Sequence, residues 1–331
     1  MTPVFHRKRT LRDVAKAAGV SLSTASNALN DCGRVNAETK VRVQKIAMDI
    51  GFFPNALARS LLSRRSFTIG MLTNDTYGRL TLPMAAGVSE ALVDHGISVF
   101  LCATNNDPRL ATLHLKALLE RQVDGIIFTA TRLDTALPAE LSTFPVPVVY
   151  AFAEGPPSSR SFVPDDAHGA SLALGHLRNS GRSKIIHITG PRDYQAARIR
   201  AAEYQRQCGS GSDVLFGEWS EEWGHEAVRK VMSRNGVTPD AIFCGSDEIA
   251  RGVIDALRDL EISVPDEIAV VGFDNWEVVS KQTRPPLTTV DMQLKELGHQ
   301  VGMAMLAISH GDPIAPGIVK LPCRLVRRHS S

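Results

Sequence analysis

The 331-residue sequence is poor in cysteine and has no long apolar segment. Its 5 cysteines are scattered, odd in number and never spaced as C-x-x-C, which favours reduced thiols over a disulfide framework or a zinc site. No apolar run approaches the roughly 18 residues of a membrane-spanning helix. The N-terminus is basic and leads into a helical pattern rather than an apolar signal region, so we expect a cytoplasmic protein.

Sequence signatures of common enzymes are also missing. No G-x-G-x-x-G opens a helix after Ile69 or Val99, and neither G-x-x-x-x-G-K-[ST] nor G-x-S-x-G occurs. Serine, histidine and aspartate are present, but no spacing singles out a triad. Four of the histidines stand apart from other metal-ligand residues: His168, His176, His187 and His225. We therefore predict a protein that is not an enzyme and binds neither a cofactor nor a metal.

Charge is nearly balanced overall but is distributed unevenly. The net charge is +2, and 44% of the residues are hydrophobic, which is enough to form the cores of two or three domains. Residues 1–66 hold 12 Lys and Arg against 4 Asp and Glu, whereas the remainder holds 25 against 31. A basic head on an acidic body predicts that the head is the part that binds a polyanion.

Residues 10–30 carry the pattern of two short helices joined by a tight turn. Thr10 can cap the first helix, Gly19 can end it in a left-handed conformation, and Ser21 can cap the second. Apolar positions of the first helix recur at i, i+3, i+4 and i+7: Leu11, Val14, Ala15 and Ala18. The outer face of the second helix carries Leu22, Ser23, Ser26, Asn27 and Asn30. This small, mostly polar face favours a DNA-binding helix-turn-helix over a core hairpin.

A third helix and a short helical segment follow. The third starts at Asn36 or Ala37 and stops at Gly51, and its apolar residues close a small core: Val43, Ile46, Ala47 and Ile50. Pro54 to Leu62 is shorter than the roughly 12–15 residues that hold a helix in water. It could be a linker helix packed on its own domain, or a segment that becomes helical on DNA.

From Phe67 the pattern changes to short apolar runs that alternate with helix-length segments. The runs are TIGML, ISVFL, GIIF, PVVY, KIIHI, DVLF, AIFC and AVVGF. Continuous apolar strands separated by helices indicate parallel sheets covered on both faces. A break near Phe162 to Asp166 divides the runs into four and four. We predict an α/β body of two doubly wound lobes, with a ligand between them at the carboxyl ends of the strands.

Together these segments resemble the lactose/galactose repressor family of bacterial transcription regulators. GFFPNALARSL at Gly51 to Leu61 is similar to the family's hinge segment, G-Y-x-P-N-x-x-A-x-x-L. Its ligand-domain motifs are similar to Asp165-Asp166, to GFDN at Gly272 to Asn275 and to PPLTTV at Pro285 to Val290. The resemblance implies lobes of the periplasmic-binding-protein type, crossed by the chain near Pro164, Val290 and Val319.

The same resemblance implies which residues contact DNA. Leu22, Ser23 and Asn27 would reach base edges, and the phosphate contacts would come from Ser21, Thr24, Ser26 and Asn30. A hinge helix paired with its twin would add Asn55, Ala58 and Leu61, with Leu61 wedged between base steps in the minor groove. Many family members have Arg where this sequence has Asn27, and asparagine suits adenine whereas arginine suits guanine.

Six residues are candidates to bind a small-molecule effector. They are Thr129, Asp165, Arg200, Trp219, Ser246 and Asp274, of which Arg200, Trp219 and Asp274 match family positions. Each has an alternative role as a helix cap, a core residue or a solvated side chain, and convergence on strand ends is what favours binding. The sequence departs from the family at the loop DTYGRLTLPM and at Phe152, where many members have an aspartate, and the second departure predicts a pocket that is less polar on that side.

We therefore predict a homodimeric transcriptional repressor that reads a near-palindromic operator under the control of a sugar-related effector. The predicted domains are a head at 9–53, a hinge at 54–66 and a body at 67–331. Lobe 1 would be about 67–163 plus 291–319, and lobe 2 about 164–290 plus 320–331. The tail LPCRLVRRHSS leaves no room for a leucine heptad, which predicts a dimer rather than a tetramer. The alternatives are a transporter's solute-binding protein and a Rossmann-type enzyme with an accessory head.

Overall fold

The computed structural model describes residues 9–30, 33–52, 65–209, 214–233 and 238–331. Two compact units make up the chain, one ending at Phe67 and the other beginning at Thr68. We call them the head and the body. Each has a core of its own, so each is described separately below.

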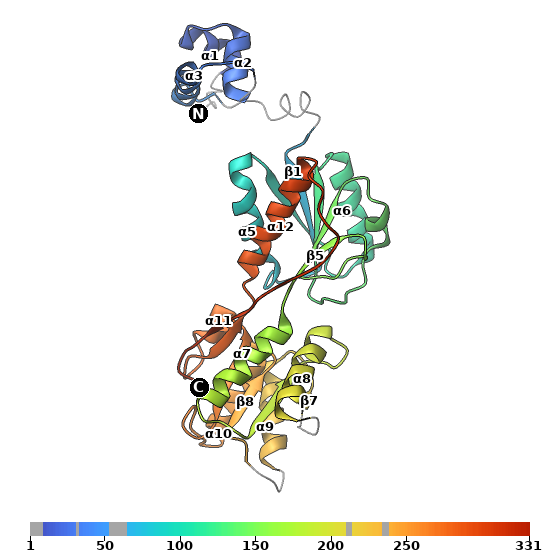
Figure 1. Cartoon of the computed structure of the whole chain (residues 1–331), viewed down its shortest axis with the longest axis vertical. Coiled ribbons are helices and arrows are strands. Elements are labelled where there is room, and N and C mark those ends of the chain that lie inside the picture. Colours follow the sequence, from blue (N-terminus) through green and yellow to red (C-terminus); the bar gives the residue numbers. More distant parts are fainter. Residues whose placement is uncertain (1–8, 31–32, 53–64, 210–213, 234–237) are drawn as a thin grey trace, which may run out of the picture. The chain divides into compact units, whose positions relative to one another are not determined.

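The head consists of three helices, α1 (Leu11–Ala18), α2 (Leu22–Asn30) and α3 (Ala37–Asp49) (Figure 1). Thr10 and Asp13 form a capping box at the start of α1, in which each side chain accepts the other residue's backbone N–H. Gly19 ends the helix with φ +65°, a conformation that costs glycine little because it has no Cβ. Asn36 caps α3 by accepting the amide of Thr39 at 2.8 Å.

The core of the head is built from small side chains. Its fully buried residues include Val14 on α1, Ala25 on α2 and Val43 on α3. Leu11, Leu29, Val35, Ile46 and Ile50 pack around them and are partly buried. The alanines allow the helices to approach closely, which leaves the polar side of α2 facing away from the core.

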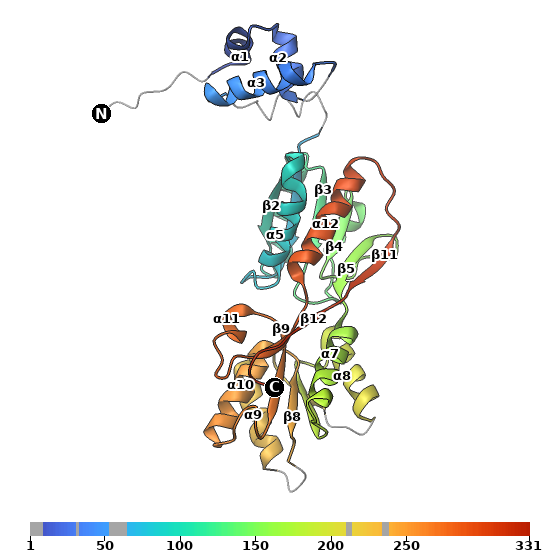
Figure 2. The ribbon, with the colours of Figure 1, turned by 60° about the vertical axis from the view of Figure 1, so that its left-hand side comes forward.

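The first lobe of the body is a six-stranded parallel sheet. In sheet order its strands are β11 (Gly317–Leu321), β5 (Arg160–Pro164), β4 (Val148–Ala151), β3 (Gly125–Thr129), β1 (Thr68–Thr73) and β2 (Ser98–Ala103). Helices α5 (Thr81–Leu92) and α12 (Leu294–Ser309) lie side by side on one face (Figure 2), and α6 (Pro108–Glu120) covers the other (Figure 1). Two 3-10 turns, η1 (Val93–His95) and η2 (Ala139–Thr143), complete this lobe.

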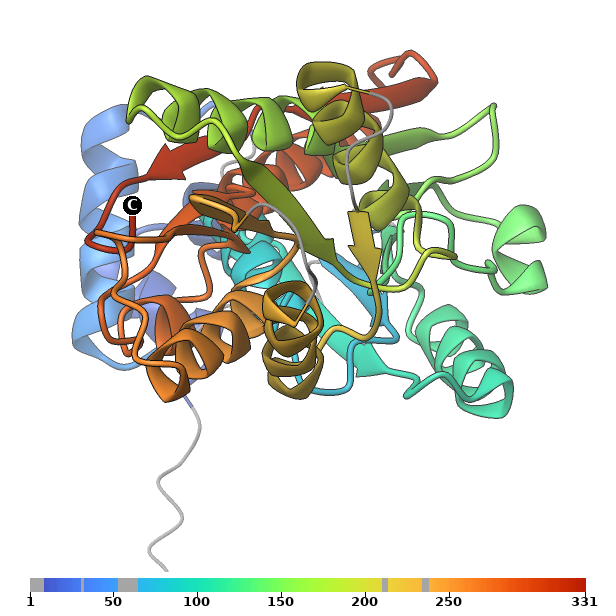
Figure 3. The ribbon, with the colours of Figure 1, turned by 90° about the horizontal axis from the view of Figure 1, so that it is seen from below.

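The second lobe repeats this plan with one antiparallel edge. Its strands, in sheet order, are β12 (Arg324–Val326), β10 (Thr288–Asp291), β9 (Ala269–Asp274), β8 (Ala241–Cys244), β6 (Ile185–Thr189) and β7 (Val214–Phe216), with β12 antiparallel to β10. Helices α7 (Asp166–Asn179) and α8 (Gln195–Cys208) cover one face, and α9 (Glu221–Met232) and α10 (Asp247–Asp259) the other (Figure 3). A short helix, α11 (Glu277–Ser280), follows β9.

The body confirms the predicted architecture of two doubly wound lobes but not the predicted number of strands. We expected four strands in each lobe, and each sheet has six. The four additional strands are β5, β10, β11 and β12, three of which continue directly into a segment that passes to the other lobe. The stretch near Phe162, predicted as a break, is the strand β5. It ends at Pro164, immediately before α7 begins the second lobe.

Candidate functional site

The N-terminal end of α2 presents a cluster of hydroxyl groups. Ser21 precedes the helix and its Oγ accepts the amide of Thr24 at 3.0 Å. The same oxygen lies 2.8 Å from the hydroxyls of both Ser23 and Thr24. Leu22 is 48% exposed at this end of the helix, although it is a large apolar side chain. Hydroxyl donors and an exposed methyl-bearing side chain can form both polar and apolar contacts in a major groove.

The other predicted DNA contacts on α2 differ in their surroundings. The amide of Asn30 donates to the carbonyl oxygen of Ser26 at 3.0 Å and lies 3.3 Å from its hydroxyl. The side chain of Asn27 is half-buried and lies beside the backbone of Gly33. Asn27 and Asn30 therefore contact their own domain as well as bordering the outer face. Asn55, Ala58 and Leu61 of the predicted hinge lie outside the described residues.

A cavity of about 540 Å³ lies between the two lobes of the body. Its walls are largely aromatic and aliphatic, and its aromatic side chains are Tyr77, Phe152, Tyr194, Trp219 and Trp276. Charged side chains also line the cavity, and the arginines among them form ion pairs with neighbouring carboxylates. This size and this mixture are typical of sites that bind small polar molecules with an apolar face.

Four of the six predicted effector-binding residues line this cavity: Arg200, Trp219, Ser246 and Asp274. Thr129 and Asp165 are not among its lining residues. Thr129 is fully buried and its hydroxyl is directed at the sulfur of Met84, 4.0 Å away. Asp165 caps α7 by accepting the amide of His168 at 3.0 Å. Thr129 is the last residue of β3 and Asp165 follows β5, as predicted. Successive side chains of a strand point to opposite faces, so a position at a strand end does not determine whether the side chain faces the cavity.

Arg200 lines the cavity, and several contacts hold its buried guanidinium in place. Its Nε donates to Asp166 Oδ1 at 2.8 Å and its Nη2 lies 2.7 Å from the same oxygen, while Nη1 donates to the carbonyl oxygen of Gly245. The guanidinium lies 3.6 Å from the centroid of the Phe273 ring and 5.9 Å from that of Trp219. With so many donors engaged, Arg200 can position the indole of Trp219 and present a fixed charge to a ligand.

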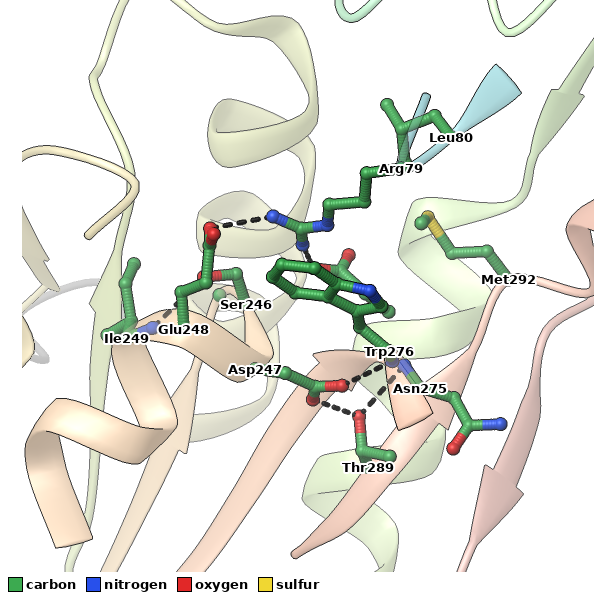
Figure 4. Close-up of polar contacts among 12 residues, drawn as sticks. Arg79, Leu80, Ser246, Asp247, Glu248, Ile249, Asn275, Trp276, Thr289 and Met292 are labelled. Carbon is green, nitrogen blue, oxygen red and sulfur yellow. Dashed lines mark hydrogen bonds and ion pairs between the residues drawn. The ribbon is translucent and has the colours of Figure 1, made fainter. Parts of the chain in front are cut away.

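Asp274 and Asp247 bring two carboxylates together at the end of β9. Asp247 is completely buried, and it accepts the amide of Trp276 at 2.7 Å and the hydroxyl of Thr289 at 2.5 Å (Figure 4). Burial and the neighbouring Asp274 raise the pKa of Asp247 well above its ordinary value. Ser246, just before it, caps α10 by accepting the amide of Ile249 at 3.2 Å.

Several cavity residues were not among the predicted effector-binding residues. They include three residues from loops: Arg79, Tyr194 and Trp276. Arg79 belongs to the loop DTYGRLTLPM, whose sequence departs from that of many family members. Arg79 pairs with Glu248 and Asp274 of the other lobe. Arg132 of lobe 1 stacks on Tyr194 at 4.0 Å and pairs with Asp193 at 2.9 Å. Ion pairs therefore connect the lobes at two places around the cavity.

Family models match two parts of the chain. Residues 10–55 match the model described as bacterial regulatory proteins, lacI family, and residues 174–331 match a periplasmic binding protein-like domain. The transcriptional regulator DegA of Bacillus subtilis (strain 168) is 30% identical over 334 residues, covering 98% of each chain. The ribose operon repressor of Escherichia coli (strain K12) is 33% identical, covering 87% of this chain and 89% of its own.

The chain belongs to the lacI family of bacterial regulatory proteins. As a lacI-family member it is a DNA-binding transcription regulator. Its fold agrees with that of the lac repressor dimer bound to operator and an anti-inducer (TM-score 0.76, 26% identity, 98% of this chain and 99% of that one). It also agrees with the regulator CelR in complex with cellobiose (TM-score 0.69, 25% identity, 98% and 100%).

The described residues contain no helix long and apolar enough to cross a membrane. Within the same residues, no group of three or more His, Cys, Asp and Glu side chains is arranged to hold a metal ion.

Proposed function

We propose that this lacI-family regulator is a repressor that binds a near-palindromic operator as a homodimer, and that a small molecule in the cavity between the lobes controls its operator affinity. The observation that best supports effector control is the position of the cavity, because ion pairs between the two lobes lie around it. A ligand that binds there can alter the interactions that connect the two lobes. Differential binding to two interlobe arrangements is what lets a ligand shift an equilibrium.

The division of labour in the chain follows from the same proposal. Residues 9–53 would read DNA through α2, 54–66 would form the hinge, and 67–331 would bind the effector and dimerise. The chain would pass from one lobe to the other three times, near residues 164, 291 and 320. The protein would act in the cytoplasm and would not be an enzyme. A solute-binding protein would have no use for a helix-turn-helix head, which disfavours that alternative.

The proposed effector contacts are Arg200, Trp219, Ser246 and Asp274. The indole of Trp219 provides an apolar face, Asp274 accepts hydrogen bonds, and Arg200 and Ser246 fix the positions of their neighbours. Phe152 and Tyr77 of lobe 1 add apolar surface to the lining from the other lobe. A sugar or sugar-like metabolite with one hydrophobic face and several hydroxyls would fit such a lining.

Thermal-shift screening of the body (68–331) against sugars, amino sugars, sugar acids and nucleosides tests the effector site. A molecule that binds the folded state raises its unfolding temperature by mass action. Each stabilising compound is then added to the full chain bound to its operator, and the operator affinity is measured by fluorescence anisotropy. We expect a stabilising compound to change operator affinity, and the effect to disappear in Trp219→Ala. Compounds that stabilise the body without altering operator binding would contradict the proposal.

A further inference from the structure

Arg79 reaches across the cavity from one lobe to the other. It belongs to the loop between β1 and α5 of lobe 1, and its guanidinium donates to Glu248 Oε2 of lobe 2 at 2.6 Å. A second nitrogen, Nη2, pairs with the carboxylate of Asp274. The guanidinium lies 4.8 Å from the centroid of the Trp276 ring (Figure 4). Two carboxylates and one aromatic face around a guanidinium are the groups with which proteins bind cationic ligands.

The wall that Arg79 contacts carries more negative than positive charge. Two carboxylates of lobe 2 lie there, Glu248, which is 24% exposed, and Asp274, which is 8% exposed. The other arginines that line the cavity are engaged elsewhere, Arg200 with Asp166 and Arg132 with Asp193. Separation of the lobes would remove Arg79, because it comes from lobe 1, and would leave Glu248 and Asp274 facing the cavity without its charge.

The guanidinium of Arg79 does not make all the hydrogen bonds that it could donate. Its Nε is buried and has no hydrogen-bond partner among the described residues, whereas Nη1 and Nη2 are both paired. A buried N–H without a partner loses the hydrogen bond that it would make in water, which is unfavourable. The side chain as a whole remains 22% exposed, on the side of the cavity. A ligand whose own cationic group reached Glu248 and Asp274 could therefore compete with it.

We propose that Glu248, Asp274 and the ring of Trp276 form a cation subsite of the effector cavity, that Arg79 fills this subsite as an internal ligand, and that the effector carries a guanidinium or amine group that replaces it. The inference rests on the proposed function of the cavity and names the class of its ligand. Displacement of Arg79 breaks an interlobe connection, which is how occupancy of the subsite changes the relation between the lobes.

Removal of the internal ligand provides the test. In Arg79→Ala the subsite should be vacant, so methylguanidinium should bind there and raise the unfolding temperature of the full chain. At ten times the dissociation constant, mass action corresponds to a rise of about 2–5 °C. Sodium chloride at the same ionic strength serves as the salt control. The wild-type chain and Arg251→Ala, which removes an arginine from an exposed pair with Glu221 outside the cavity, should show no saturable rise.

Two further variants locate the binding. The rise should disappear in Arg79→Ala combined with Asp274→Asn, and fall in Arg79→Ala combined with Glu248→Gln. Arg79→Gln, which keeps an uncharged polar side chain and removes the guanidinium, provides a second background if Arg79→Ala folds poorly. Absence of a saturable rise in both single variants at position 79, or an equal rise when Asp274 is replaced, would overturn the subsite.

The class of the effector is tested separately on the wild-type chain. Glucosamine and glucuronate each differ from glucose at a single carbon, with a cationic amine at C2 in the first and an anionic carboxylate at C6 in the second, and agmatine carries a guanidinium on an aliphatic chain. Cationic members of such a set should stabilise the wild type more than their neutral and anionic partners. An uncharged or anionic effector would refute the inference while leaving the proposed function intact. Failure of every stabilising compound to alter operator binding would refute the proposed function, whatever methylguanidinium does in Arg79→Ala.

Discussion

The indole of Trp219 lies directly against the backbone of Gly190, in the space that a side chain at position 190 would occupy. A Cβ at Gly190 would overlap atoms of the indole ring. Gly190 follows strand β6, and Trp219 lies between strand β7 and helix α9. The glycine therefore determines how far the indole can withdraw from the effector cavity.

Gly190→Ala should push Trp219 into the cavity and weaken effector binding. Overpacking typically costs about 1–3 kcal/mol; where effector binding bears that cost, we expect a roughly 5- to 160-fold loss of affinity for any effector found by the thermal-shift screen. Operator affinity without effector should be unchanged. Isothermal titration calorimetry measures the first quantity and anisotropy the second. Gly175→Ala is the control, because a Cβ there would meet no atom within 4 Å. Equal effector affinities in the two variants would show that Trp219 is not part of the site.

Asp166→Ala should strongly destabilise the body. It leaves Arg200 buried without its carboxylate partner, and their side chains are 4% and 2% exposed. Loss of one partner of a buried ion pair typically costs about 3–5 kcal/mol in the free energy of unfolding, measured here by urea denaturation. Glu226→Ala, which breaks an exposed pair with Lys230, should cost less than about 1 kcal/mol. Similar losses in the two variants would contradict the structural role assigned to Asp166.

Stability of the body should fall as the pH falls below 6.5, in part because of His187. Burial lowers the pKa of His187 from 6.5 to about 3, while its Nδ1 bonds the carbonyl oxygen of Phe243 at 2.9 Å. The unfolded chain takes up a proton near pH 6.5 and the folded chain does not. The stabilisation is therefore present above pH 6.5 and is lost progressively towards pH 3.

His187→Phe should remove this contribution and keep a ring against Phe243. Between pH 7.5 and pH 5.5, the wild type should lose about 1.4 kcal/mol more unfolding free energy than the variant. Urea denaturation at the two pH values provides the measurement. An identical pH dependence in both proteins would mean that His187 is protonated, or accessible to protons, in the folded state.

Much of the head could be predicted from single residues. Thr10, Gly19 and Asn36 lie where the helices begin and end because capping depends on the nearest few residues. The edge strands were harder to predict, since β11 and β12 are short and pair with strands that are far away in the sequence. Pairing of Val319 with Phe162, for example, joins segments separated by most of the body.

The cavity was predicted less completely than the fold. Trp219 and Asp274 could be proposed from positions near strand ends, but direction decided the outcome for Thr129, which faces Met84. Arg79 could not be placed, because its partners Glu248 and Asp274 come from the other lobe. Contacts across two lobes depend on the path of the whole chain, and local patterns do not contain that information.

Asn27 is predicted to select adenine at one position of each half-site. Its amide can pair with the N6 and N7 atoms of adenine, so Asn27→Ala should cost about 1–3 kcal/mol and relax that position. Selection of sites from random duplexes with each protein measures the preference. Ser23→Ala is a useful comparison, since Ser23 lies on the same helix and should affect a different position. Unchanged preference at every position in Asn27→Ala would show that its half-buried side chain does not reach the bases.

The central claim is that the full chain reads DNA as a symmetric pair of heads. Its most direct test is selection of binding sites from random duplex DNA, followed by affinity measurements on the enriched site at several salt concentrations. We predict two inverted half-sites and an affinity that falls steeply as salt rises, because the basic head displaces counterions from the phosphates. Enrichment of no sequence, or of a single half-site bound by one chain, would contradict the account.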